Sequence, residues 1–373
     1  MDCVLSLAGG SAATVTSIGR GIESKAFEKH NIKRADRLLS NSHLQREQLV
    51  VYAAICRLFC CTKRPVIAVD WSDLDRVKGH FLLRAAMTLD GRPITLYQEV
   101  HPLSTKEKPA VHARFLSILS AMLPPGCQPI IVTDAGFKSP WFRQVEALGW
   151  HFVGRVRKPN FYSLDQGDTW QCISHLYGQA SQRPKRCDGL LARYKPFACT
   201  LTLYRQKGKG RQSLNPDGSK QRAGQSIKHA QGAKEPWLLA SNLPKARHHS
   251  KQVVAIYRQR MQIEEGFRDM KSAQLGLGFE NSRSTKPARI SILLLLSTLA
   301  SLVLVLLGLT MTVGNQHGRF QANTVKKKRA LSFHTLGLRA VSKGLKFTKR
   351  QWQKALVRYR ELLHATSYEQ AWN

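Results

Sequence analysis

Residues 65–71, PVIAVDW, begin a series of short apolar segments that decides the fold class. Two similar segments follow, HFLLRAAMTL at residues 80–89 and PITLYQEV at residues 93–100, and Lys-Gly and Asp-Gly turn signals separate the three. Apolar runs of this length, bounded by turn residues, are typical of β-strands. The sequence therefore predicts three consecutive strands.

Helical and strand-like segments alternate after these strands. We expect a helix over residues 107–122, a strand over 129–133, a helix over 141–148 and a strand over 151–156. The order is then β-β-β-α-β-α-β. It predicts an α/β fold, a ribonuclease H-like mixed sheet that brings acidic residues at neighbouring strand ends close together.

Composition divides the chain into five expected parts. They are a helical DNA-binding region at 1–62, the first part of the catalytic core at 63–158, a β-rich insertion at 159–249, the second part of the core at 250–310 and a basic C-terminal region at 311–373. Within the insertion, residues 207–231 are rich in Gly, Lys, Ser and Gln and predict a basic loop.

The chain is strongly basic, with 58 lysines and arginines against 24 aspartates and glutamates and a net charge of +34. The basic residues are spread along the sequence, which favours an extended polyanion such as duplex DNA. A ribosomal or histone-like binder has a similar charge. However, 373 residues with 43% hydrophobic content can form a large core, which such binders seldom need. The composition therefore favours an enzyme that acts on nucleic acid.

The N-terminal region contains FEKHNIKRADRLLSNSHL at residues 27–44, whose apolar residues keep helical spacing. Lys29, Lys33 and Arg34 give this predicted helix a cationic face, and we expect them to contact DNA. A solvated helix at the edge of a domain is the alternative. The net charge of the whole chain favours DNA binding.

The eight cysteines form no CxxC pair and lack zinc-site spacing, which predicts reduced thiols in a cytoplasmic protein. The first twenty residues do not have the pattern of a secretory signal, and we expect a cytoplasmic, nucleoid-associated protein. Residues 290–309, ISILLLLSTLASLVLVLLGL, are apolar and long enough to span a bilayer. Because this segment has no partner span and contains four Ser and Thr residues, we favour the central helix of a soluble core over a membrane span.

Two aspartates follow apolar strands directly. Asp70 ends PVIAVD and Asp134 ends PIIVTD, and a carboxylate in such a position is costly unless it is paired or binds a metal ion. Either residue alone is more simply explained as a cap or a turn former. Two of them on strands that this topology makes neighbours are harder to explain in that way.

A third acid lies on the predicted helix IYRQRMQIEEGFRDMKS, residues 256–272. Four polar residues occupy an arc of about 60° on this helix: Tyr257, Arg260, Glu264 and Lys271. Glu265 points to a different side at about 100° per residue, so Glu264 is the expected functional carboxylate.

Three converging carboxylates, Asp70, Asp134 and Glu264, would suit Mg²⁺, with Mn²⁺ able to substitute, because both ions bind carboxylate and phosphate oxygens. Asp73 and Asp75 are nearby alternatives, but only Asp70 directly closes the apolar strand. Two ions in such a site can serve phosphoryl transfer with either water or a DNA 3′-hydroxyl as the nucleophile.

The helix resembles the Tyr-x2-Arg-x3-Glu-x6-Lys signature of DDE transposases of the insertion-sequence-four family. Other segments resemble the transposon-ten group of that family, and they lie in the same order: KHNIKRADRLL, VDWSDL, VTDAGFKSPWF, AKEPWLLASNLP and RMQIEEGFRDMKS. Members of the family have more sequence before KHNIKR, so recognition of the transposon end is expected to be weaker here.

The resemblance implies a metal-dependent triad of Asp70, Asp134 and Glu264 that nicks the transposon end, forms and reopens a DNA hairpin and joins the 3′ end to target DNA. It also implies that Tyr257 and Arg260 hold the phosphate beside the hairpin.

Further implications of the resemblance concern DNA and assembly. Lys271 would contact the DNA backbone, and Trp237 would stack on a flipped base, although a core tryptophan is nearly as good an explanation. The implied partners are transposon-end inverted repeats, target DNA and a second copy of the chain in a synaptic homodimer. A catalytically inactive DNA-binding protein or repressor is the alternative function.

Overall fold

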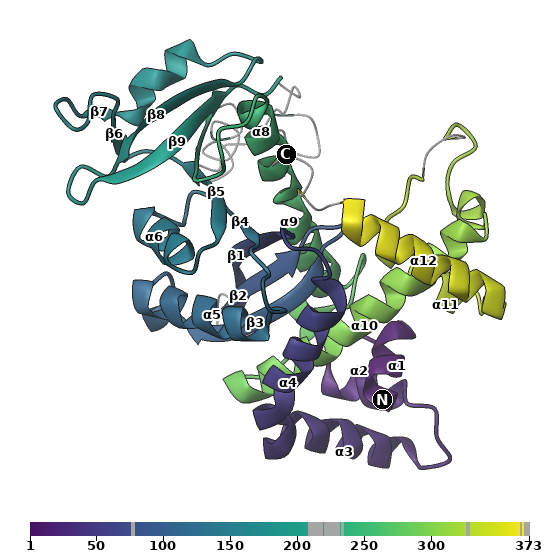
Figure 1. Cartoon of the computed structure of the whole chain (residues 1–373). Helices are drawn as coiled ribbons and strands as arrows, with labels where there is room; N and C mark the ends of the chain where they lie inside the picture. Colours follow the sequence, from purple (N-terminus) through teal and green to yellow (C-terminus); the bar gives the residue numbers. More distant parts are fainter. Residues whose placement is uncertain are drawn as a thin grey trace. The chain divides into compact units, whose positions relative to one another are not determined.

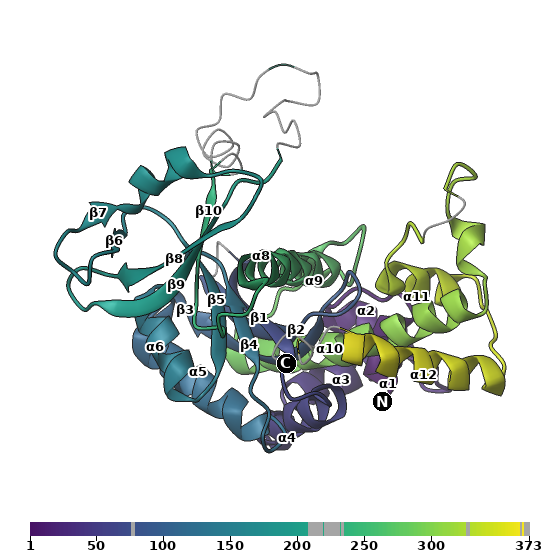
Figure 2. The same cartoon turned by 45° about the horizontal axis from the view of Figure 1, so that its top comes forward.

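The computed structural model describes residues 1–75, 79–207, 219, 232, 235–325, 329–365 and 368. The chain forms two compact units (Figures 1 and 2). Unit 1 contains residues 1–129 and the described residues from 260 onward, and unit 2 contains residues 130–259. Most of the predicted basic loop, residues 207–231, lies outside the described residues.

Unit 1 contains the three predicted strands, β1 (Val66–Asp75), β2 (His80–Met87) and β3 (Ile94–Pro102), in an antiparallel meander. The prediction that Asp70 ends its strand is wrong. Asp70 lies opposite Arg84 of β2, and the pairing of β1 with β2 continues as far as Asp75. The ladder of hydrogen bonds to β2 extends β1 beyond the apolar run.

Alternate side chains of β1 point to opposite faces of this sheet. The face of Ala68 packs against α9 (Met261–Lys271) and α10 (Pro287–Val313) in the main hydrophobic core of the unit. The face of Trp71 is covered by α5 (Pro109–Met122), whose Phe115 stacks on Tyr97 with ring centroids 4.9 Å apart. Because Asp70 and Trp71 are adjacent in β1, their side chains point to opposite faces of the sheet.

The apolar segment at 290–309 forms most of α10. This helix is long and apolar enough to cross a membrane, but 61% of its most apolar window is buried inside the protein. The helices α11 (Phe333–Ser342) and α12 (Lys349–Ala365) pack along it (Figure 1). A Cβ on Gly308 would lie 1.9 Å from the carbonyl oxygen of Phe333, so glycine allows α10 and α11 to approach closely. The burial is that of a core helix.

The N-terminal region is helical, as expected. It contains α1 (Asp2–Ala8), α2 (Val15–Arg20), α3 (Glu28–Leu39) and α4 (Ser42–Phe59). The hydroxyl of Thr14 caps α2 and the side-chain oxygen of Asn41 caps α4, each by accepting a backbone N–H. Apolar residues of α1, α2 and α3 share one core with the first half of α10, so these helices are an integral part of unit 1.

Within unit 2, neighbouring strands follow the order β4-β5-β10-β9-β8-β6-β7. The strands, in sequence order, are β4 (Ile130–Thr133), β5 (His151–Val156), β6 (Phe161–Ser163), β7 (Gln171–Cys172), β8 (Lys185–Leu191), β9 (Phe197–Tyr204) and β10 (Trp237–Ser241). Among the described strand pairs of this unit, β4 and β5 are parallel and the others are antiparallel. The strands of the predicted insertion thus continue the sheet of β4 and β5.

In the described part of unit 2, the helices α6 (Ser139–Ala147) and α8 (His249–Gln259) accompany these strands. Phe142 of α6 stacks on Phe152 of β5 with ring centroids 4.7 Å apart. Short 3-10 helices complete the described chain: Leu103–Thr105, Ile173–Gln179, Phe279–Asn281 and His317–Phe320. Mixed strand directions and flanking helices confirm the α/β class and are consistent with a ribonuclease H-like fold.

Candidate active site

The helix that carries the four-residue signature is interrupted. The sequence predicted one helix, but α8 ends at Gln259 and α9 begins at Met261. Arg260 keeps helical dihedral angles (φ −51°, ψ −35°), and its carbonyl accepts the N–H of Ile263 at 3.0 Å, so α9 starts a new turn at this residue. Tyr257 consequently belongs to unit 2, whereas Arg260, Glu264 and Lys271 belong to unit 1.

Arg260 contacts two of the predicted catalytic acids. Its Nη1 lies 3.2 Å from Oδ2 of Asp70, and its Nη2 lies 2.6 Å from Oε1 of Glu264. The first contact joins the start of α9 to β1, and the second spans one turn of α9. One guanidinium therefore brings together carboxylates from distant parts of the sequence.

Burial differs sharply among these three groups. The side chains of Asp70 and Arg260 are 12% and 10% exposed, whereas the side chain of Glu264 is 47% exposed. Oδ1 of Asp70 also accepts the backbone N–H of Trp71 at 2.8 Å. Among these three side chains, two carboxylates share one guanidinium, and the more exposed carboxylate is that of Glu264.

Lys271 is directed at the same strand. Its Nζ donates to Oγ of Ser72 at 2.7 Å and to the carbonyl of Asp73. The carboxylate of Asp73 lies 3.5 Å from Nζ of Lys106. The last turn of α9 is therefore held against β1 just beyond Asp70. For Asp75, the other alternative acid, the structure describes no side-chain environment.

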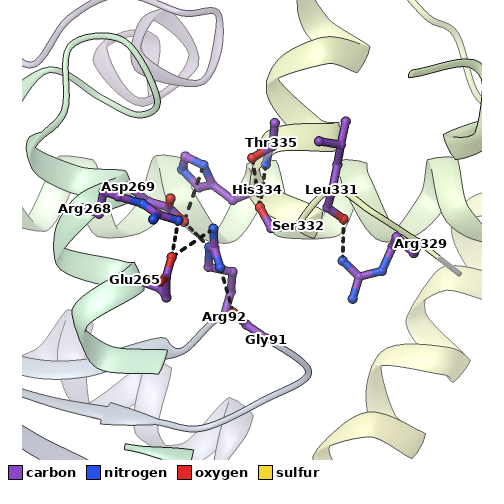
Figure 3. A network of polar contacts seen from close by, with 10 residues as sticks. All are labelled: Gly91, Arg92, Glu265, Arg268, Asp269, Arg329, Leu331, Ser332, His334 and Thr335. Carbon is purple, nitrogen blue, oxygen red and sulfur yellow. Dashed lines mark hydrogen bonds and ion pairs between the residues drawn. The ribbon is translucent and has the colours of Figure 1, made fainter. Parts of the chain in front are cut away.

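The opposite side of α9 carries a separate polar network (Figure 3). Arg92 contacts Oδ2 of Asp269 through Nε at 2.5 Å and Oε2 of Glu265 through Nη2 at 3.5 Å, and Arg268 also binds Glu265. His334 points at Asp269, with 3.9 Å between Nδ1 and Oδ2. Glu265 therefore has its own basic partners, in agreement with its different position on the predicted helix.

Trp71, next to Asp70, is held by α5. Its indole Nε1 donates to Nε2 of His112 at 3.0 Å. Its ring makes an edge-to-face contact with the ring of His101, with ring centroids 5.3 Å apart. His101 in turn lies 2.8 Å from the carboxylate of Glu99. Burial lowers the pKa of His112 to about 4, so its imidazole is neutral at neutral pH and can accept the indole hydrogen.

Replacement of His112 by Gln should flatten the pH dependence of stability. An unfolded histidine titrates near pH 6.5, whereas His112 in the folded chain titrates at about pH 4. As the pH is lowered through this window, the unfolded chain takes up a proton that the folded chain does not, so the free energy of unfolding decreases. His112 should account for about 2 kcal/mol of the loss between pH 7 and pH 5. Urea unfolding at both pH values measures this, and equal losses in the wild type and the variant would contradict the assignment.

Asp134 and the two aromatic site residues belong to unit 2. Asp134 directly follows β4, as expected, and its Oδ1 accepts the N–H of Gly136 at 2.8 Å, which closes a turn. Trp237 makes an edge-to-face contact with Tyr257 at 4.9 Å and a tilted contact with Tyr204 at 5.7 Å. The convergence of Asp134 with Asp70 and Glu264 stays a prediction.

The predicted DNA-contacting residues of the N-terminal region lie on α3. Lys29 and Lys33 are exposed, and Nζ of Lys29 lies 5.9 Å from the ring centroid of Phe27. Arg34 is paired with Asp2 at 2.6 Å and contacts Asn31. The helix and its cationic surface are as expected, and DNA binding by these residues stays a prediction.

Within the part of the chain that the structure describes, no group of three or more His, Cys, Asp or Glu side chains could hold a metal ion. Two acids do converge, because the oxygens of Asp70 and Glu264 face one guanidinium. Carboxylate oxygens are the ligands that Mg²⁺ and Mn²⁺ prefer, so this pair of donors fits either ion.

Sequence reasoning missed the residues that support this site. Arg92 and His112 have no marked local pattern, and only their contacts with Asp269 and Trp71 identify them. The scarcity of acids in so basic a chain was a usable signal for Asp269.

A model of the transposase DDE domain family matches residues 62–303. No curated protein matches the sequence significantly. The matched region includes β1 with Asp70, the strand and turn of Asp134, and α9 with Glu264. Because the match covers more than half of its length, this chain belongs to the DDE transposase family, whose members are nuclease-type enzymes that use divalent metals.

Proposed function

We propose that this transposase is a cut-and-paste enzyme of the insertion-sequence-four family, in its transposon-ten group. It would nick each transposon end, form and resolve a DNA hairpin and join the 3′ end to target DNA. The observation that carries the proposal is the pairing of Asp70 and Glu264 with the single guanidinium of Arg260, since it gathers two of the three proposed catalytic acids.

Asp70, Glu264 and Asp134 would supply the oxygen ligands for Mg²⁺, or for Mn²⁺ in its place. Bound divalent ions would activate the attacking oxygen and stabilise the leaving oxygen. In the metal-free chain, the N–H of Trp71 and the guanidinium of Arg260 hold Asp70, and Arg260 also holds Glu264.

The remaining signature residues would bind DNA. Tyr257 and Arg260 would hold the phosphate beside the hairpin, and Lys271 would contact backbone further along. Trp237 would stack on a flipped base, which its contact with Tyr257 supports by joining two proposed DNA-binding residues in one aromatic cluster.

Cations of the N-terminal region, Lys29, Lys33 and Arg34, would add affinity for the transposon end through phosphate contacts. The proposed partners are terminal inverted repeats, target DNA and a second copy of this chain in a synaptic homodimer. The proposed location is the cytoplasm, in association with the nucleoid.

Strand cleavage of a duplex that carries the cognate terminal repeat tests this function. With Mg²⁺, the purified wild-type chain should yield hairpin-ended products, and Asp70→Asn should yield none because it loses a metal-binding charge. Denaturing gel electrophoresis separates the hairpin from the nicked strand. Persistent cleavage by Asp70→Asn would refute the assignment of this residue, and salt-sensitive binding without any cleavage by the wild type would instead indicate an inactive repressor.

A further inference from the structure

We propose that Arg260 is an exchangeable counter-ion, which occupies Asp70 and Glu264 in the metal-free protein and is displaced when a divalent cation binds. The inference rests on the proposed function, because it takes these two carboxylates as metal ligands. It adds regulation to that site: loading of the cation and release of the arginine become one event.

The geometry is that of a guanidinium clamped between two acids. Nη1 lies 3.2 Å from Oδ2 of Asp70 and Nη2 lies 2.6 Å from Oε1 of Glu264, so each carboxylate engages a different terminal nitrogen. The two terminal nitrogens of one guanidinium are held by a rigid planar group, which fixes the spacing of the two carboxylates. Arg260 therefore preserves the pair in the absence of a metal ion.

Charge and burial explain why a counter-ion is needed. Asp70 is 8% exposed, and a buried carboxylate beside a second carboxylate is unfavourable unless a cation neutralises it. Arg260 is itself 9% exposed and keeps its charge at any ordinary pH. The metal-free site is therefore stabilised by the same attraction that a metal ion would use.

A divalent ion and the guanidinium compete for the same oxygen lone pairs. Charge-assisted hydrogen bonds from Arg260 occupy one oxygen of each acid, and a cation bound there would also repel the adjacent positive charge. The site opens at Glu264, whose side chain is 47% exposed, so an ion can approach from solvent. The displaced guanidinium then becomes available to a DNA phosphate, the ligand proposed for Arg260.

A titration of the DNA-free full-length chain with Mn²⁺ tests the exchange. Electron paramagnetic resonance of free Mn²⁺ gives the dissociation constant directly. We expect Arg260→Ala to bind Mn²⁺ about tenfold more tightly than the wild type, or better, because the ion no longer has to break two charge-assisted hydrogen bonds. Adding Glu264→Gln to Arg260→Ala should abolish the gain.

Arg268→Ala is the matched control. It removes one arginine from the same helix, but that arginine binds Glu265, so the Mn²⁺ affinity should stay within about twofold of the wild type. If Arg260→Ala does not fold, as judged by circular dichroism, Arg260→Gln is titrated instead with the same expectation. If Arg260→Ala, or Arg260→Gln in its place, bound Mn²⁺ no more tightly than the wild type, the proposal would be overturned.

The outcome is separable from that of the proposed function, because these titrations contain no DNA. Tighter Mn²⁺ binding by Arg260→Ala, together with a wild type that never cleaves terminal-repeat DNA, would support the exchange and refute the transposition chemistry. Cleavage by the wild type, together with no gain in Mn²⁺ affinity in Arg260→Ala, would support the transposition chemistry and refute the exchange.

Discussion

Glu264→Gln is expected to lower the rate of strand cleavage by about 1,000-fold or more, a change of about 4 kcal/mol in the activation free energy. The amide is nearly isosteric with the carboxylate but carries no charge, so it is a poor ligand for a hard cation. The exposed side chain of Glu264 makes a folding defect small by comparison. Single-turnover cleavage of a pre-nicked terminal-repeat duplex, with protein in excess over DNA, measures the effect.

Glu265→Gln is the control for that experiment, because it makes the same change at the next residue. Glu265 is bound by Arg92 and Arg268 on the other side of α9, so cleavage should fall by no more than a few-fold. A severe loss in Glu265→Gln with normal cleavage by Glu264→Gln would reverse the assignment of the two carboxylates.

Arg92→Ala is expected to lower the free energy of unfolding by about 3 to 5 kcal/mol. The side chains of Arg92 and Asp269 are only 15% and 7% exposed, and removal of the arginine leaves the carboxylate of Asp269 buried. In the wild type, burial and the charge of Arg92 lower the pKa of His334, so Arg92 and not His334 is the counter-ion of Asp269 at neutral pH. Urea unfolding of the full chain, followed by circular dichroism, gives the difference.

Arg268→Ala serves as the comparison for stability as well. Its ion pair with Glu265 is half exposed, and pairs of this kind contribute about 1 kcal/mol or less. We therefore expect a small shift in the urea midpoint. If Arg92→Ala destabilised the protein no more than Arg268→Ala, the buried network in Figure 3 would not hold α9 in place.

Much of the architecture follows from local patterns. The three strands after residue 65, the helix at Pro109–Met122 and the strand at His151–Val156 all lie close to their predicted positions. Alternation of apolar residues and the turn residues between segments are properties of neighbouring positions, so they can be read without knowledge of distant contacts.

Two features of the backbone depend on more distant partners. β1 continues past Asp70 because β2 supplies hydrogen bonds as far as Asp75, although the apolar run has ended. The predicted single helix divides at Arg260, whose guanidinium faces β1 as well as its own helix. The helical spacing of the sequence continues through Arg260, so periodicity alone does not predict this break.

For the site, the scarcity of acidic residues and the spacing of the signature motif were sufficient to select candidate residues. With 24 acids against 58 basic residues, Asp70 and Glu264 stand out at the level of sequence, and the signature motif adds Arg260. Most of the contacts of the site depend on folding, because they join segments that are distant in the sequence. The contact of Arg260 with Asp70, the indole hydrogen bond to His112 and the buried Arg92–Asp269 pair all arise from packing between elements, which no local pattern encodes. The contact of Arg260 with Glu264 is an i,i+4 pair, which helical spacing does predict.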